Sequence, residues 1–146
     1  MPELLDMVSL YTDGGSRGNP GPAAIGIIIY SPKGHVLASF RGFIGRTTNN
    51  QAEYAALSKG LAIASRFTRK QVRCYSDSEL MISQLTRSYR VKSRALRVAV
   101  DLVREAEKAF EKVKYFHLRR SNPRIKRADR LVNLALDEAA RGGEKL

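Results

Sequence analysis

Five short segments of the chain have the apolar and β-branched pattern of strands. Residues 8–12 form the first segment, which ends at Asp13-Gly14-Gly15. Residues 23–30 and 35–44 flank the turn SPKG at 31–34, an arrangement typical of a hairpin. Residues 71–76 and 113–118 form two further segments with valine and aromatic residues. The pattern therefore predicts five strands, of which the first three form an antiparallel meander.

Between these strands the apolar positions recur at the spacing of a helix. A first helix is predicted to begin at the cluster TNN of 48–50 and to run to about residue 66. Others are predicted over 77–87, over 96–110 and over 126–141. The resulting order βββαβααβα predicts an α/β protein with one mixed sheet flanked by helices, and a single domain over residues 1–146. The tail at 141–146 is expected to fray.

Composition narrows the class of protein. A hydrophobic share of 43%, a charged share of 27% and a single cysteine fit neither a disordered chain nor a disulfide framework. The first ten residues lack a basic segment, and no apolar run approaches the roughly 18 residues of a membrane span. We therefore expect a soluble cytoplasmic protein that does not bind membranes.

The charge of the chain favours a polyanionic partner. Lysine and arginine number 26 against 14 acidic residues, which gives a net charge of +12. The basic residues cluster in two segments. The clusters are Arg87, Arg90, Lys92, Arg94 and Arg97, and Arg119, Arg120, Arg124, Lys126, Arg127 and Arg130. They are either solvated faces or phosphate contacts, and a position beside a site would favour contacts.

Four acidic residues occupy unusual positions. Asp13 and Asp77 each follow a predicted strand, although a turn aspartate and a helix N-cap are the ordinary alternatives. Glu53 and Asp129 lie on the apolar stripe of their helices, where an ionised group is costly unless it is paired. A capping box with Asn50 would explain Glu53, and a first-turn position would explain Asp129. Because four separate explanations would be needed, one shared site is favoured.

Four carboxylates at one sheet edge would form an oxygen-rich site. The chain has no cysteine cluster, and only His35 and His117 could supply nitrogen ligands. A hard cation is therefore expected, with Mg²⁺ as the natural choice and Mn²⁺ as its substitute. Two ions about 3.5 to 4 Å apart can activate a water and stabilise a leaving oxygen on a phosphate. The implied chemistry is phosphodiester hydrolysis.

The chain resembles type 1 ribonuclease H over nearly its whole length. The motifs that carry the resemblance are YTDGGSRGNPGPAAIG at 11–26, TTNNQAEYAAL at 47–57, SDSELMISQL at 76–85 and ADRLVNLALDEA at 128–139. Their joint order and spacing are highly specific. The segment SYRVKS at 88–93 looks like the short bacterial and archaeal members, which lack a basic protrusion.

The resemblance implies a sheet of order 3-2-1-4-5 and endonucleolytic cutting of the RNA strand of RNA/DNA hybrids, leaving 5′-phosphate and 3′-hydroxyl ends. Asp13 matches the aspartate that bridges two metal ions. Glu53 and Asp77 match the ligands on the leaving-group side, and Asp129 matches the ligand nearest the attacking water. Two Mg²⁺ ions are expected with substrate. No obligatory protein partner is implied, and a monomer is expected.

The resemblance also predicts substrate contacts, which include polar groups for the backbone of the hybrid and residues near the cut. The predicted contacts are Gly14, Gly15, Asn19, Thr48, Asn49, Asn50, Ser78, Glu79, Arg119 and Arg120. Helix caps are the alternative for Asn49 and Asn50, and a turn is the alternative for Asn19. The wide minor groove of the hybrid would present the ribose 2′-hydroxyls that identify RNA.

Two positions depart from the family pattern. Many members carry a histidine about ten residues before the last aspartate that assists turnover. Here Arg119 occupies that position and His117 lies two residues earlier, so either could take the role, and Arg119 or no equivalent is favoured. Ile125 stands where asparagine is usual, which leaves the hydrogen bonding of this loop open.

Three functions are compatible with these motifs. The leading one is a ribonuclease H. A related resolvase or transposase-like nuclease that cuts DNA, or a member that also accepts double-stranded RNA, would keep the fold and change the substrate. A binding module that has lost catalysis is the third, but replaced carboxylates would be expected in that case and all four are present.

Overall fold

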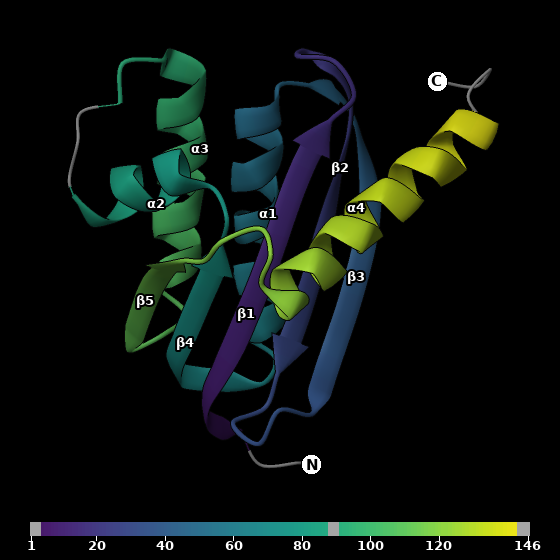
Figure 1. The fold of residues 1–146 in the computed structure, drawn as a ribbon. Coiled ribbons are helices and arrows are strands. Elements are labelled where there is room, and N and C mark those ends of the chain that lie inside the picture. The colour runs from purple at the N-terminus through teal and green to yellow at the C-terminus, as the bar shows by residue number, and fades with distance from the viewer. Residues whose placement is uncertain (1–3, 88–90, 143–146) are drawn as a thin grey trace.

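The computed structural model describes residues 4–87 and 91–142. The described residues form five strands and four helices in the order βββαβααβα (Figure 1). The strands are β1 (Leu5–Ser16), β2 (Gly21–Tyr30), β3 (Val36–Thr47), β4 (Thr68–Ser76) and β5 (Lys112–His117). The helices are α1 (Asn49–Ala64), α2 (Glu79–Thr86), α3 (Arg94–Glu107) and α4 (Pro123–Arg141).

The strands form one mixed sheet in the order β3-β2-β1-β4-β5. The pairs β1–β2 and β2–β3 are antiparallel, while β1–β4 and β4–β5 are parallel. This is the predicted sheet, so the predicted order and directions are confirmed. The prediction that Asp13 ends its strand is wrong, because Asp13 pairs with Gly26 and the ladder continues to Ser16 and Ala23.

Helices cover the two faces of the sheet unequally. Helix α1 lies against β1 and β2, and α3 packs on α1 in the same layer (Figure 1). This layer encloses the main core, whose fully buried members include Leu10, Ile27, Leu57 and Val72. On the opposite face α4 runs diagonally over β1, β2 and β3 (Figure 1). The clustered acidic residues lie between these layers, where β4 ends beside the central strand β1.

Several helix boundaries differ from the prediction. Helix α4 begins at Pro123 rather than near residue 126, because the Asn122 side chain caps it and proline fits the first helical position. Helix α3 ends at Glu107, before Phe110. Helix α4 extends to Arg141, and residues 143–146 of the tail that is expected to fray lie outside the described residues.

Other predictions concern residues that the structure does not describe. Arg90 of the first basic cluster lies among residues 88–90, as does the start of the SYRVKS segment. Among the described residues, none of the helices has the length and apolar character to cross a membrane.

Candidate active site

Strand register places Asp13 beside Asp77. Tyr11 of β1 pairs in parallel with Tyr75 of β4, and each aspartate lies two residues beyond this pair. Strand β4 ends at Ser76, so Asp77 is the first residue after it, whereas β1 continues past Asp13. Because parallel strands keep the same direction, two residues at equal offsets from a paired row lie next to each other. The two carboxylates therefore meet at the end of β4.

A glycine contact brings Glu53 to the same place. A Cβ on Gly14 would lie only 2.2 Å from the backbone oxygen of Ala52, so α1 approaches β1 as closely as a glycine allows. At this contact the Gly14 N–H donates to the Glu53 Oε1 at 2.9 Å. The hydrogen bond fixes the buried Glu53 carboxylate over the strand that carries Asp13.

A second glycine positions the last helix. Gly26 pairs with Asp13 across the β1–β2 ladder, and a Cβ on Gly26 would lie 2.3 Å from the backbone oxygen of Ala128. The backbone of helix α4 therefore contacts the sheet at the residue that pairs with Asp13. Asp129 follows Ala128 directly, so this contact brings Asp129 near Asp13. Asp129 and Asp13 line one cavity of about 170 Å³ together with Glu53.

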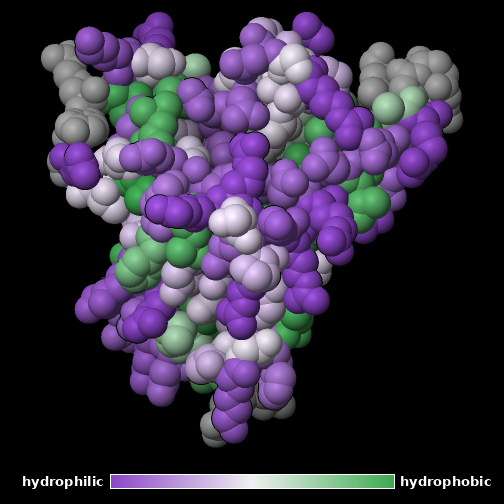
Figure 2. All heavy atoms as spheres, viewed as in Figure 1, coloured by the Kyte–Doolittle hydropathy of each residue, from purple (hydrophilic) through white to green (hydrophobic). Residues whose placement is uncertain are grey.

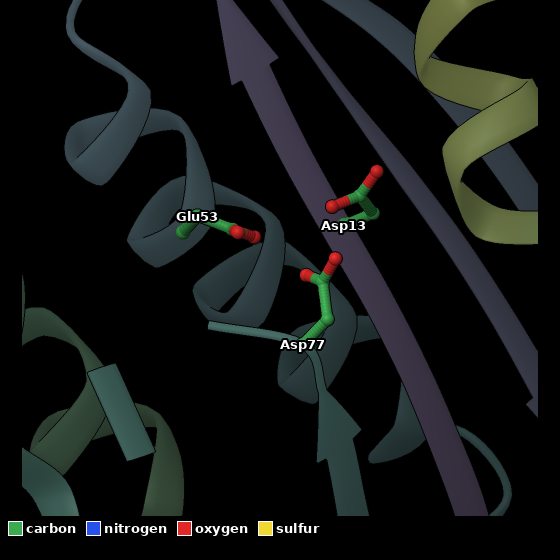
Figure 3. A group of neighbouring side chains, drawn as sticks. All are labelled: Asp13, Glu53 and Asp77. Carbon is green, nitrogen blue, oxygen red and sulfur yellow. The ribbon is translucent and has the colours of Figure 1, made fainter. Parts of the chain in front are cut away.

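Three of the four predicted carboxylates form a tight cluster. Asp13, Glu53 and Asp77 offer oxygens that all lie within 4.8 Å of one another, and their side chains converge in Figure 3. Asp129 lies at the rim of this cluster and is half-buried, so the expectation of a buried position is wrong. Its Oδ2 accepts a hydrogen bond from the Asn133 side chain at 3.4 Å.

The cluster holds more negative charge than its surroundings neutralise. Burial, and then the charges of Asp77 and Asp129, raise the pKa of Asp13 to about 8. Burial and the same kind of repulsion raise the pKa of Glu53 well above its ordinary value, although the Gly14 N–H opposes the rise. The nearby cation is Arg120, whose Nε lies 3.3 Å from the Asp77 Oδ2 but whose side chain is 84% exposed. Because an exposed ion pair is weak, Arg120 does not neutralise the carboxylate cluster, and a bound cation would stabilise its charged form.

Comparisons with known proteins agree on one family. A family model described as reverse transcriptase-like matches residues 11–135. A ribonuclease HI of Halobacterium salinarum is 40% identical over 138 residues, which are 94% of this chain and 68% of the relative. The RNase H1 crystal structure from that archaeon matches with a TM-score of 0.86 and 41% identity, covering 91% of this chain and 99% of the other. The chain belongs to the ribonuclease H family.

One further relative is much longer than this chain, and another was crystallised with a nucleic acid. The bifunctional protein Rv2228c of Mycobacterium tuberculosis is 37% identical over 134 residues, and the match covers 91% of this chain but 36% of that protein. LC11-RNase H1 in complex with an RNA/DNA hybrid matches with a TM-score of 0.85 and 37% identity, covering 91% and 99% of the two chains. The predicted family and the prediction of a ribonuclease H enzyme are thus confirmed.

The ordinary explanations for the acidic residues of this ribonuclease H do not apply. Thr48, not Asn50, caps α1, and the Glu53 carboxylate accepts from Gly14 instead of forming a capping box. Ser78 caps α2, so Asp77 is not its N-cap. Asp129 lies beyond the first turn of α4, which begins at Pro123. Helix ends therefore do not account for Glu53, Asp77 and Asp129, and Asp13 lies within β1 and not in a turn.

Hydrogen bonds connect several of the residues that are predicted to contact the substrate, in the loop after β1 and at the start of α1. The Asn49 Oδ1 accepts from the Ser16 N–H at 3.2 Å, and the Asn49 N–H donates to the Asn19 Oδ1 at 2.9 Å. The Thr48 hydroxyl accepts from the Gln51 N–H as the cap of α1. Structural roles thus exist for Thr48, Asn19 and Asn49, and Asn50 is exposed beside them. Their role in substrate binding stays a prediction.

The other predicted contacts surround the carboxylates. Gly15 lines the 170 Å³ cavity, as Gly14 does. The Ser78 hydroxyl accepts from the Met81 N–H, and Glu79 is exposed in the first turn of α2. Arg120 also lines the cavity.

The loop between β5 and α4 contains both departures from the family pattern. Arg119 is exposed in this loop, and His117 is exposed at the end of β5, where it pairs in register with Ser76. Which of them assists turnover stays open. Ile125 is fully buried against Tyr11 and Tyr30, and Asn122 instead supplies the polar group that caps the helix. The isoleucine therefore serves packing.

Sequence reasoning missed several residues of the site. Gly26 admits α4 to the sheet, and Arg17 and Asn133 line the cavity. The position of Gly26 could have been noticed, because it is a single glycine inside the strand sequence AAIGIIIY. A glycine within a strand often marks the close approach of another backbone segment. No comparable pattern marks Arg17 or Asn133.

The raised pKa of Asp13 predicts how pH affects the metal-free enzyme. An unfolded chain loses this proton near the ordinary pKa of 3.8, whereas the folded protein keeps it until about pH 8. Unfolding between about pH 4 and 8 releases the proton, so the free energy of unfolding falls as pH rises through this window. Calorimetry in a chelator should show a thermal midpoint that drops with rising pH more steeply in wild type than in Asp13→Asn. Equal slopes would contradict the assignment.

Proposed function

We propose that this ribonuclease H hydrolyses the RNA strand of RNA/DNA hybrids as an endonuclease, leaving 5′-phosphate and 3′-hydroxyl ends. The observation that carries the proposal is the convergence of Asp13, Glu53 and Asp77, whose oxygens lie within 4.8 Å of one another. The hybrid in the LC11-RNase H1 crystal, a protein 37% identical to this one, supports the choice of substrate.

The residues of the site fit a divalent cation. Carboxylate oxygens are preferred by Mg²⁺ and Mn²⁺, and the buried cluster has little cationic compensation apart from the exposed Arg120. Asp13, Glu53, Asp77 and Asp129 would hold two Mg²⁺ ions together with substrate, and Mn²⁺ would substitute. Bound ions supply the positive charge that activates a water and stabilises the leaving oxygen of a phosphodiester.

The chain itself orients the reacting groups. The Gly14 N–H holds the Glu53 carboxylate over β1, and the contact of Gly26 with α4 holds Asp129 opposite Asp13. Among the described residues Arg120 is held by an exposed ion pair to Asp77 alone, so it can turn toward a substrate phosphate at small energetic cost. Asn19, Asn49 and Thr48 present a preformed polar loop to the backbone of the hybrid.

A parallel cleavage assay tests the substrate. A labelled RNA/DNA hybrid, the matching DNA duplex, a branched DNA and the matching RNA duplex are incubated with enzyme and Mg²⁺, then repeated with Mn²⁺. We expect cleavage of the RNA strand of the hybrid, with product ends identified by susceptibility to phosphatase and to ligation. Preferential cutting of branched or duplex DNA would instead indicate a resolvase-like nuclease, and tight hybrid binding without cleavage would indicate a binding module.

The second basic cluster predicts a salt-dependent affinity for the hybrid. Each phosphate contact that releases a counterion contributes about 0.7 to 0.9 to the slope of log affinity against log salt. Replacing both Arg119 and Arg120, which are exposed in the loop before α4, by alanine should therefore reduce the slope by roughly one to two units. Binding is measured in chelator so that no cleavage occurs. Lys59→Ala, on the opposite layer in α1, is the matched control and should leave the slope unchanged.

The proposal also includes the oligomeric state and the cellular location of the enzyme. The carboxylate cluster is assembled from a single chain, so a monomer suffices for catalysis and no protein partner is required. A cytoplasmic location agrees with a chain whose one cysteine, Cys74, is buried as a free thiol. Sedimentation of the purified protein at catalytic concentrations tests the monomer.

A further inference from the structure

Strands β4 and β5 carry basic and aromatic side chains on the face of the sheet that points away from the main core. Side chains alternate along each strand, so Val72, Cys74 and Tyr115 enter the main core while their neighbours point to the other side of the sheet. Those neighbours are Arg73, Tyr75, Lys114 and Phe116, which we call the aromatic-basic face. Helix α4 packs over β1, β2 and β3, so this face continues beyond the helix (Figure 1).

Three aromatic rings form a column across this face. Register aligns Tyr11 of β1 with Tyr75 of β4, and Tyr75 with Phe116 of β5. The Tyr11 and Tyr75 ring centroids lie 4.6 Å apart with planes at 12°, and those of Tyr75 and Phe116 lie 5.1 Å apart at 21°. Stacked rings of this kind leave free faces only at the two ends of the column.

The two ends of the column differ. At the inner end the Arg124 guanidinium lies 5.5 Å from the Tyr11 ring centroid and 3.9 Å from that of Tyr30, which closes the column. At the outer end Phe116 stands on the edge strand and is 37% exposed. A groove of about 560 Å³ lies at this edge between β5 and the helices α2 and α3, and Lys114 and Phe116 belong to its β5 side. The column therefore ends in an aromatic ring with room beside it.

Positive charge accompanies the open ring. The row next to the aromatic column aligns Ser9, Arg73 and Lys114. The Arg73 Nε is buried, and none of the residues that the structure describes forms a hydrogen bond with it. Of the two acids that line the groove, Glu107 is bound by Arg104 and by the Tyr115 hydroxyl, and Glu111 is exposed. Figure 2 views this side of the molecule and shows hydrophobic residues between hydrophilic ones over β4 and β5.

We propose that the aromatic-basic face binds single-stranded RNA that extends beyond the hybrid. A planar base continues the column on Phe116, and Arg73 and Lys114 contact the phosphates, the combination that single-strand binding surfaces use. The face reaches the catalytic edge without a break, because Phe116 precedes His117, which pairs with Ser76, the neighbour of Asp77. The choice of RNA rests on the proposed function, since the strand held at Asp77 is then RNA.

Extended hybrids test this face in isolation from cleavage. Binding is measured by fluorescence anisotropy in chelator with a blunt hybrid and with hybrids that carry an RNA extension of about eight nucleotides at one end or the other. We expect one extension to raise the affinity about ten-fold over the blunt hybrid. Phe116→Ala should abolish this gain, Phe116→Trp should keep it, and Lys114→Glu should reduce it. All should bind the blunt hybrid like wild type.

The controls separate this proposal from the proposed function and from misfolding. Lys59→Glu makes the same charge change on the opposite layer and should retain the gain, while thermal midpoints check that each variant folds. A gain that survives Phe116→Ala, or is lost equally in Lys59→Glu, would overturn the proposal. An equal gain from a DNA extension would overturn the assignment to RNA. Failure of the proposed function would appear differently, as absent cleavage of the blunt hybrid with Mg²⁺.

Discussion

Asp13→Asn is expected to lower the rate of hybrid hydrolysis at least about 1000-fold, a loss of about 4 kcal/mol of transition-state stabilisation. Asp13 belongs to the cluster, and its carboxylate oxygen lies within 4.8 Å of oxygens of both Glu53 and Asp77. An amide keeps the shape of the side chain but removes the charge that would hold a cation between them. In the absence of metal the same change should raise the thermal midpoint, because it removes a buried carboxylate whose pKa is about 8.

The opposite signs of the two effects make the experiment decisive. Asp101→Asn is the matched control, since Asp101 is an exposed aspartate on α3, in the helical layer opposite α4. It should change neither the rate nor the midpoint appreciably. Isothermal titration with Mg²⁺ should show weakened metal binding in Asp13→Asn only. A variant that cleaves at nearly the wild-type rate would exclude the proposed site, and one that loses stability would contradict the charge repulsion within it.

The convergence of Asp13, Glu53 and Asp77 could be predicted from the sequence, because two of them follow predicted strands and the third lies on the apolar stripe of a helix. Glu53 lies on the apolar stripe of α1, a placement that only a buried role explains, and the structure buries it to 6% exposure. The strand pattern predicted an antiparallel meander in a mixed sheet, and the family resemblance implied the strand order that the structure shows. The start of α4 was also within reach, because Asn122-Pro123 is a typical N-cap and first helical residue.

Contacts between distant segments could not be predicted in this way. The extension of β1 through Asp13 depends on Gly14 to Ser16 pairing with residues of β2, and glycines lower the strand propensity of the segment taken alone. The hydrogen bonds that join Asn19, Asn49 and Ser16 link two loops whose proximity follows only from the folded sheet. Likewise the rim position of Asp129 depends on how deeply α4 lies on the sheet.

Gly26 sets how closely α4 approaches the sheet. The substitution Gly26→Ala should therefore lower both the stability of the protein and its catalytic rate. The added Cβ would lie 2.3 Å from the backbone oxygen of Ala128 and 2.9 Å from the Leu131 Cβ, so the helix must move away from the sheet. Overpacking against backbone of this kind should cost about 3 kcal/mol, or roughly 10 °C in thermal midpoint. Moving α4 also carries Asp129 away from Asp13, so hybrid hydrolysis well below the midpoint should fall about 10 to 100-fold.

Gly42→Ala on β3 provides the comparison, because its Cβ would meet only the end of the Phe40 ring, at 3.0 Å, and a side chain can turn aside. This variant should lose less than about 1 kcal/mol and keep wild-type activity. If the loss in Gly26→Ala arises from the position of Asp129, raising Mg²⁺ should recover part of the activity without restoring the midpoint. A Gly26→Ala enzyme with unchanged metal dependence would show that α4 supports the fold without positioning a ligand.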